Sequence, residues 1–178
     1  MPNVTNPPAL APQQTGAWCF AAAEVMVRAY YNLPTMTQYD IARAALWALS
    51  RVDAGEQDQW DLAEALDQSL NQNENGGANM ASQIVQLVRS HYGALNNTAT
   101  NGHFFNGVLA AADVRGQIDA DKIFVIGNPI HYYVVYGYEN NGDTMTLLDS
   151  WPANVGGLRT QMTLTEFGAL SNKLAIFF

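Results

Sequence analysis

The spacing of apolar residues changes near Lys122, from the period of an amphipathic helix to the short apolar runs of β-strands. Upstream, helical spacing and terminating Gly or Pro residues predict helices at residues 18–31, 37–51, 58–71, 80–93 and 103–118. Downstream, β-branched and aromatic runs between turn residues predict strands at residues 122–127, 131–139, 144–151, 156–167 and 173–178. Helices followed by antiparallel strands predict an α+β domain with two unlike layers.

The first two predicted helices have recognisable boundaries. Leu33 and Pro34 end the first, because the residue before a proline is biased away from helical geometry. Thr37, three residues before Asp40, is an N-cap candidate and forms with it a loose capping box at the start of the second helix. We therefore expect two consecutive helices joined by a short turn.

The length of 178 residues is typical of one domain that buries its own core. We expect a single domain over residues 1–178, with an extended, Pro-rich and linker-like segment at 1–12, a mainly helical part at 13–117 and a β-rich part at 118–178. A hydrophobic content of 48% with 13% charged residues is typical of a globular chain. No run reaches the roughly 18 apolar residues of a membrane-spanning helix, so the sequence predicts no membrane contact.

The net charge and the cysteine content limit the classes of partner and the cellular compartments that suit this chain. Sixteen acidic and eight basic residues give a formal net charge of −8, and such a surface repels phosphate backbones, which argues against nucleic acid as a partner. One cysteine cannot form an internal disulfide, so folding does not depend on an oxidising compartment. The first residues lack the basic and apolar regions of a Sec signal peptide. The sequence does not decide the localisation: the protein could be secreted, be delivered as a bacterial effector, or stay in the cytoplasm.

Cys19, the only cysteine, lies at the start of the first predicted helix, in the stretch QQTGAWCFAAAEVM. A thiol reacts as the thiolate, a form that a helix N-terminus or a neighbouring imidazolium favours. A lone cysteine is more often a small core residue than a nucleophile. The interpretation of Cys19 therefore depends on whether the chain offers it a histidine.

Three histidines could supply the imidazole. His91 lies near the end of a predicted helix, where a cation stabilises the carbonyl dipoles, so a capping or surface role suits it better. His103 follows Asn-Gly in a loop, without a partner that the sequence indicates. His131 begins a strand after a Gly-Asn-Pro turn, and such an edge can direct a ring into a cleft. His131 is therefore the candidate base.

A base histidine needs an acceptor that orients its ring, and Asp149 is the candidate. The segment ENNGD at residues 139–143 predicts a hairpin turn between the strands that carry His131 and Asp149. Closing this turn with Tyr138 opposite Thr144 carries Asp149 back toward His131. Strand pairing therefore predicts that the two side chains are neighbours.

Together, three segments resemble the glutamine, cysteine, histidine and Asn/Asp blocks of papain-like cysteine peptidases, in the family's order: QQTGAWCFAAAEVM, HYYVVYGYENNG and LLDSWP. The Trp-Cys-aromatic-Ala-Ala pattern at residues 18–22 is similar to the compact bacterial branch that includes C39-like bacteriocin-processing peptidases, staphopains and plant-pathogen effector proteases. The resemblance implies a papain-like α+β fold, in which the nucleophile helix packs against a C-terminal, antiparallel, barrel-like sheet with the cleft between them.

The resemblance also implies roles for individual residues. It implies a catalytic nucleophile, base and acceptor: Cys19, His131 and Asp149. Gln13, six residues before the cysteine, would donate to the oxyanion, with Gln14 as the weaker candidate. Trp151 would cover the hydrogen bond between the histidine and its acceptor.

Two features depart from the family pattern, and each residue has a structural interpretation when taken alone. The acceptor is Asp149 rather than the asparagine of papain itself, and the usual Gly-Gly or Gly-His approach to His131 is absent. Taken singly, the site residues read as a strand histidine, a turn carboxylate, an exposed glutamine and a core tryptophan. Their combination with Cys19 is what indicates a catalytic site.

The implied function is that of a cysteine endopeptidase that uses a Cys-His-Asp triad and an acyl-enzyme intermediate on a protein or peptide substrate. The same chemistry suits a thiol amidase, a deamidase or an acyl transferase that acts as a bacterial toxin or effector. A catalytically inactive papain-fold binding module is the alternative of another class. An inhibitor or immunity protein is a further partner of such enzymes. The scattered histidines and the single cysteine show no zinc-ligand spacing, so we expect neither a metal nor another cofactor.

Overall fold

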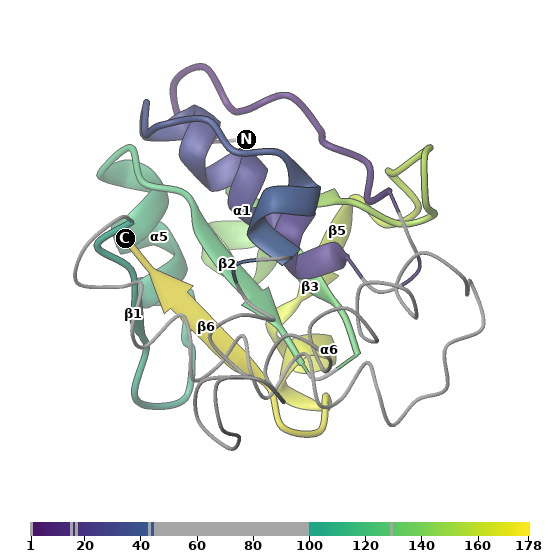
Figure 1. Cartoon of the computed structure of the whole chain (residues 1–178). Coiled ribbons are helices and arrows are strands. Elements are labelled where there is room, and N and C mark those ends of the chain that lie inside the picture. Colours follow the sequence, from purple (N-terminus) through teal and green to yellow (C-terminus); the bar gives the residue numbers. More distant parts are fainter. Residues whose placement is uncertain (1, 15, 17, 43, 45–99, 129) are drawn as a thin grey trace, which may run out of the picture.

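The computed structural model describes residues 2–14, 16, 18–42, 44, 100–128 and 130–178. Its helical elements are α1 (Cys19–Tyr30), α5 (Ala111–Asp119), α6 (Leu164–Gly168) and the 3-10 turn η1 (Asn140–Gly142). Its strands are β1 (His103–Phe104), β2 (Phe124–Gly127), β3 (Tyr132–Glu139), β4 (Thr144–Asp149), β5 (Gln161–Thr163) and β6 (Leu174–Phe177). Helices combined with an antiparallel sheet confirm the predicted α+β class (Figure 1).

Helix α1 confirms the first predicted helix and forms part of the core. Its Ala-rich sequence has high helix propensity, and most of its side chains are buried. Glu24 and Arg28, one turn apart, form an ion pair of 2.7 Å in which both side chains are almost fully buried. The helix contacts β3, so its first residue, Cys19, lies at one end of a packed element.

The second predicted helix begins where its capping box predicts. The backbone N–H of Asp40 donates to Thr37 Oγ1 at 3.1 Å, and the Thr37 N–H donates back to Asp40 Oδ2 at 3.4 Å. Residues 38–42 are helical. Most of the predicted helix at 37–51, and all of those at 58–71 and 80–93, lie outside the described residues.

The six strands form one antiparallel sheet in the order β1-β6-β2-β3-β4-β5. The C-terminal strand β6 lies between β1 and β2, as Figure 1 shows in yellow. Strands β2 and β6 are buried along their whole length, which explains why both are nearly continuous apolar runs. Strands β1 and β5 form the two ends of this order, and the barrel-like shape implied by the resemblance stays a prediction.

Two predicted elements are wrong in part. The helix predicted over 103–118 begins only at Ala111, because the chain adopts a positive φ of 144° at Gly107 and the residues before it pair with β6. The strand predicted over 156–167 is β5 followed by α6. Thr163 caps α6, since its hydroxyl accepts from the Glu166 N–H and the Glu166 carboxylate accepts from the Thr163 N–H.

The hairpin between β3 and β4 forms as predicted, but its register differs by one residue. Glu139, rather than Tyr138, lies opposite Thr144, because the chain turns through the short 3-10 segment η1. Asn140 and Asn141 both adopt positive φ there, a conformation that asparagine tolerates better than most residues. Continued without interruption, this register would place Val134 opposite Asp149.

A β-bulge in β3 restores the predicted pairing at the other end of the hairpin. The register shifts between Val135 and Gly137, which leaves Tyr136 as the extra residue. Tyr133 therefore lies opposite Asp149. Residues directly opposite each other point to the same face of a sheet, and the Tyr133 ring contacts the His131 ring, so the bulge puts Asp149 on the face of His131.

The Pro-rich N-terminal segment is not a free linker, because its first residues pair with β3. Asn3 forms a bridge with Gly137, and the Val4 N–H donates to the Tyr136 carbonyl at 2.9 Å. The Val4 side chain is buried in the core. The N-terminal segment thus occupies the edge of β3 beyond the point where β2 ends.

Among the described residues, no helix combines the length and the apolar character that a membrane span requires.

Candidate active site

Cys19 is the first residue of α1, where the backbone N–H groups of the helix have no intrahelical acceptor. The residue is 3% exposed, and its side chain lies close enough to the His131 ring to raise the pKa of that ring. The helix therefore presents the Cys19 sulfur at its N-terminal end and next to an imidazole.

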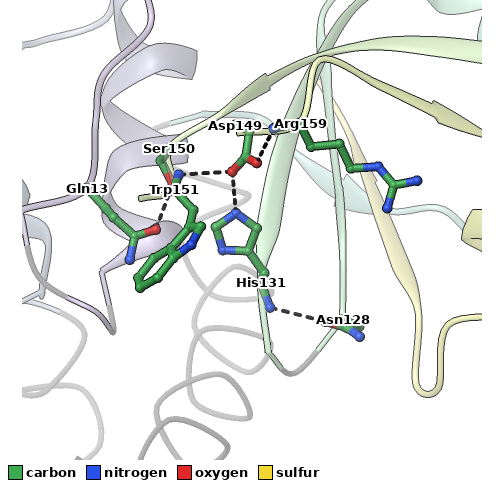
Figure 2. A network of polar contacts seen from close by, with 7 residues as sticks. All are labelled: Gln13, Asn128, His131, Asp149, Ser150, Trp151 and Arg159. Carbon is green, nitrogen blue, oxygen red and sulfur yellow. Dashed lines mark hydrogen bonds and ion pairs between the residues drawn. The ribbon is translucent and has the colours of Figure 1, made fainter. Parts of the chain in front are cut away.

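The second partner of His131 is Asp149. The distance between His131 Nε2 and Asp149 Oδ1 is 2.7 Å, and the His131 side chain is 16% exposed (Figure 2). Because Nε2 binds the carboxylate, Nδ1 is the ring nitrogen that remains for Cys19. The ring of Tyr133 meets the imidazole edge-on, with 4.6 Å between the ring centroids, and so packs against it.

The approach to His131 is an asparagine turn, which replaces the absent Gly-Gly or Gly-His. Asn128 Oδ1 accepts from the backbone N–H groups of Ile130 at 3.0 Å and His131 at 3.1 Å. Its own N–H donates to the His131 carbonyl at 3.1 Å. A Cβ at Gly127 would lie 2.5 Å from that carbonyl oxygen, so only glycine fits there. This turn determines where the histidine enters the site.

Asp149 is held by three donors. Oδ1 accepts from His131 Nε2 and from the Trp151 N–H at 2.9 Å, and Oδ2 accepts from the Arg159 N–H at 2.9 Å. Burial raises the pKa of Asp149, but the hydrogen bonds from His131, Trp151 and Arg159 outweigh it and lower the pKa below its ordinary value. The residue is therefore a fixed carboxylate.

His131 is protonated at neutral pH. Burial alone lowers the pKa of the ring, because it disfavours the charged form. The hydrogen bonds to Asp149 and Cys19, together with the charges of both groups, act in the opposite direction and raise the pKa to about 9. The site thus holds an imidazolium between the Cys19 sulfur and the Asp149 carboxylate.

Gln13, and not Gln14, is the glutamine built into the interior. Gln13 is fully buried, and its Oε1 accepts from the Ser150 hydroxyl at 3.0 Å. Figure 2 shows the amide oxygen of Gln13 turned toward Ser150 and the amide nitrogen turned away from it. Gln14 is exposed. The structure thus places Gln13 beside the residue that follows Asp149.

Trp151 lies at the surface of the site rather than in the core. It is 40% exposed, and its backbone N–H donates to Asp149. In Figure 2 its indole lies on the side of His131 that faces Gln13. This position agrees with a flanking role and is not that of a core tryptophan.

Of the other two histidines, His103 is the one in the described part of the chain, and it does not join this group. His103 lies on β1 and packs edge-on against Phe177, and His91 is outside the described residues. Sequence reasoning missed the groups that hold the site through backbone atoms, such as the Arg159 N–H, and also the Ser150 hydroxyl. Only Asn128, in a Gly-Asn-Pro turn, carries a local signal. In the described part of the chain, no cluster of His, Cys, Asp and Glu could hold a metal ion.

Comparison with known proteins identifies the family of this chain. The family described as "Peptidase_C39 like family" matches residues 6–172, which include every residue of the site. No curated protein matches the chain significantly. The match spans nearly the whole sequence, so it covers both the segment that begins α1 and the hairpin that carries His131 and Asp149. The chain therefore belongs to the Peptidase_C39 like family, of the papain-like cysteine peptidase type.

Proposed function

We propose that this protein is a cysteine endopeptidase that hydrolyses peptide bonds through Cys19, His131 and Asp149 and an acyl-enzyme intermediate. The observation that supports the proposal is the position of the His131 ring, which binds the Asp149 carboxylate at 2.7 Å and interacts electrostatically with the Cys19 side chain. Membership of a peptidase family supports the same reaction class.

In the first half of the proposed reaction, the Cys19 thiolate attacks the carbonyl carbon of the scissile bond, and the carbonyl electrons move onto oxygen. The Gln13 side-chain amide and the Cys19 backbone N–H stabilise the resulting oxyanion. When the intermediate collapses, the C–N bond breaks and the leaving amine takes the proton from His131 Nδ1. The products are a thioester on Cys19 and a free N-terminus.

In the second half, neutral His131 takes a proton from water, and the hydroxide formed attacks the thioester carbon. The C–S bond breaks, the acyl group leaves as a carboxylic acid, and the thiolate–imidazolium pair is restored. Asp149 keeps the ring oriented in both halves, because its hydrogen bond engages Nε2 and leaves Nδ1 to exchange the proton.

Profiling of newly formed N-termini tests the reaction. A denatured proteome is incubated with wild-type protein or with Cys19→Ala, and we expect new N-termini with the wild type alone. His131→Ala should lower the cleavage rate by at least about a thousandfold, as loss of a triad member does. The matched control is His103→Ala on β1, which should retain wild-type activity.

The rate of alkylation by iodoacetamide measures the reactivity of Cys19 without requiring a known substrate. Cys19 is the only cysteine, so one added group reports on it alone. We expect it to react at pH 6 faster than free cysteine, and His131→Ala should abolish that advantage. Rapid alkylation without any new N-termini would contradict the endopeptidase and favour an amidase or transferase. Alkylation no faster than that of free cysteine would favour an inactive binding module.

A further inference from the structure

Gln13 is held by the residues that follow Asp149, through both its backbone and its side chain. The Gln13 N–H donates to the Ser150 carbonyl at 3.0 Å, and the Gln13 carbonyl accepts from the Asn154 N–H at 2.8 Å. The Ser150 hydroxyl donates to Gln13 Oε1 at 3.0 Å, and Ser150 is 1% exposed. The end of β4 therefore holds Gln13 as well as Asp149.

Gln38, a buried residue of the helical segment at 38–42, holds the same stretch at the positions on either side of Gln13. Its side-chain Oε1 accepts from the Gln14 N–H at 2.9 Å, and its Nε2 donates to the Pro12 carbonyl at 2.8 Å. One carboxamide thus bridges the residues before and after Gln13, as a partner strand would.

We propose that Ser150 and Gln38 are positioning residues that keep the Gln13 amide turned with its NH2 group, rather than its oxygen, toward the reacting carbonyl. This inference rests on the proposed function, because it requires an oxyanion for Gln13 to stabilise. Neither residue touches the reacting atoms, so both act through Gln13.

The physical reason lies in the shape of a carboxamide. Its two ends have nearly the same size, so rotation by half a turn exchanges a donor for an acceptor. An oxygen in the donor position would repel the oxyanion. Among the described residues, the Ser150 hydroxyl has no acceptor other than Gln13 Oε1, so a turned amide would leave its proton buried and unpaired. That cost selects the productive orientation. Gln38 fixes the backbone from which the side chain extends.

Kinetics of Ser150→Ala, Gln38→Ala and Gln13→Ala test the inference. Gln13→Ala should lower kcat by about a hundredfold or more, the loss typical of an oxyanion donor. Ser150→Ala should lower kcat by about tenfold with KM little changed, and Ser150→Thr, which keeps the hydroxyl, should recover most of it. We expect a smaller loss for Gln38→Ala. The control Ser171→Ala removes an exposed hydroxyl and should change nothing.

Two further measurements distinguish a positioning role of Ser150 and Gln38 from a general loss of structure. In the Gln13→Ala background, Ser150→Ala and Gln38→Ala should each change kcat by less than about twofold, since their target is already gone. Alkylation of Cys19 forms no oxyanion, so its rate should be wild-type in all three single variants.

An unchanged kcat in Ser150→Ala would overturn the inference, and so would equal losses of kcat in the wild-type and Gln13→Ala backgrounds. Neither result would contradict the proposed peptidase activity, provided that the wild type cleaves its substrate. If the wild type cleaves nothing, the proposed function itself fails.

Discussion

Asp149 occupies the position where papain itself has asparagine, and the three N–H donors around it explain the difference. A carboxylate offers two acceptor oxygens, and here both are used, one by His131 and Trp151 and the other by Arg159. A carboxamide has only one acceptor atom. In either orientation an asparagine would direct its NH2 group at one or more of these N–H groups, so the site is built for aspartate.

We therefore expect Asp149→Asn to be far from conservative in this chain. The variant should lower kcat/KM by about 10²–10⁴-fold, because the ring loses its carboxylate partner and an N–H group is left facing a donor. Kinetics on a peptide substrate measure the loss, and Asp143→Asn, in the turn after η1, is the control of equal chemistry. Activity within twofold of the wild type would show that the hydrogen bond from the Arg159 N–H does not require aspartate rather than asparagine at position 149.

The raised pKa of His131 predicts an alkaline limit to activity. The folded pKa of about 9 lies above the ordinary value of 6.5, so the interactions of the imidazolium are fully present below pH 6.5 and are lost as the pH rises through about 9. We expect kcat/KM to fall on the alkaline side with a midpoint near pH 9. A pH profile from 5 to 11 checks this, and a midpoint near 6.5 would mean that the ring is not paired.

At the scale of residues, the sequence predicts the side chains of the site better than the backbone groups that hold them in place. Cys19, His131 and Asp149 can be found because their types and order form a recognisable pattern, and the structure brings them together. The Arg159 N–H cannot be found in this way, because every residue except proline has such a group. Its contribution depends only on where the loop after β4 returns.

The element that most affects the site is the bulge in β3. The turn at η1 sets a register that would point Asp149 away from His131, and the extra residue Tyr136 reverses it. The sequence predicts the correct neighbours through a turn register that is wrong by one residue, and the bulge compensates for that difference. Bulges leave only a weak sequence signal, here Gly137 inside an aromatic strand.

Gly137 also permits the N-terminal segment to pair beside the bulge. An added Cβ would lie 1.9 Å from Asn3 Oδ1 and 3.0 Å from the Pro2 carbonyl oxygen, so Gly137→Ala must displace the first residues. We expect a loss of about 1–2 kcal/mol in the free energy of unfolding, or a Tm lower by roughly 2–8 °C. Thermal unfolding measures this, and faster amide exchange at Val4 would locate it.

The control for that variant is Gly116→Ala in α5, where a Cβ meets nothing within 4 Å. This substitution should leave Tm unchanged or raise it, because alanine has the higher helix propensity. Equal Tm values in the two variants would show that pairing of the N-terminal segment adds nothing to stability.

For the whole molecule, the change of period near Lys122 correctly predicts the α+β class and that most of the strands lie downstream of it, but it misses β1 at His103–Phe104. It does not predict strand order, because an apolar run such as that of β6 is equally suited to any buried position. The placement of β6 between β1 and β2, and of the N-terminal segment on β3, depends on pairing between residues far apart in the chain.

The inner position of β6 has a consequence for the order of events during synthesis. Cys19 leaves the ribosome early, but the sheet that carries His131 has a gap between β1 and β2 until residues 174–177 have been translated. Nascent chains that end before residue 174 are therefore expected to be inert, and the proposed peptidase would gain its activity only after β6 has been made and has paired with β1 and β2.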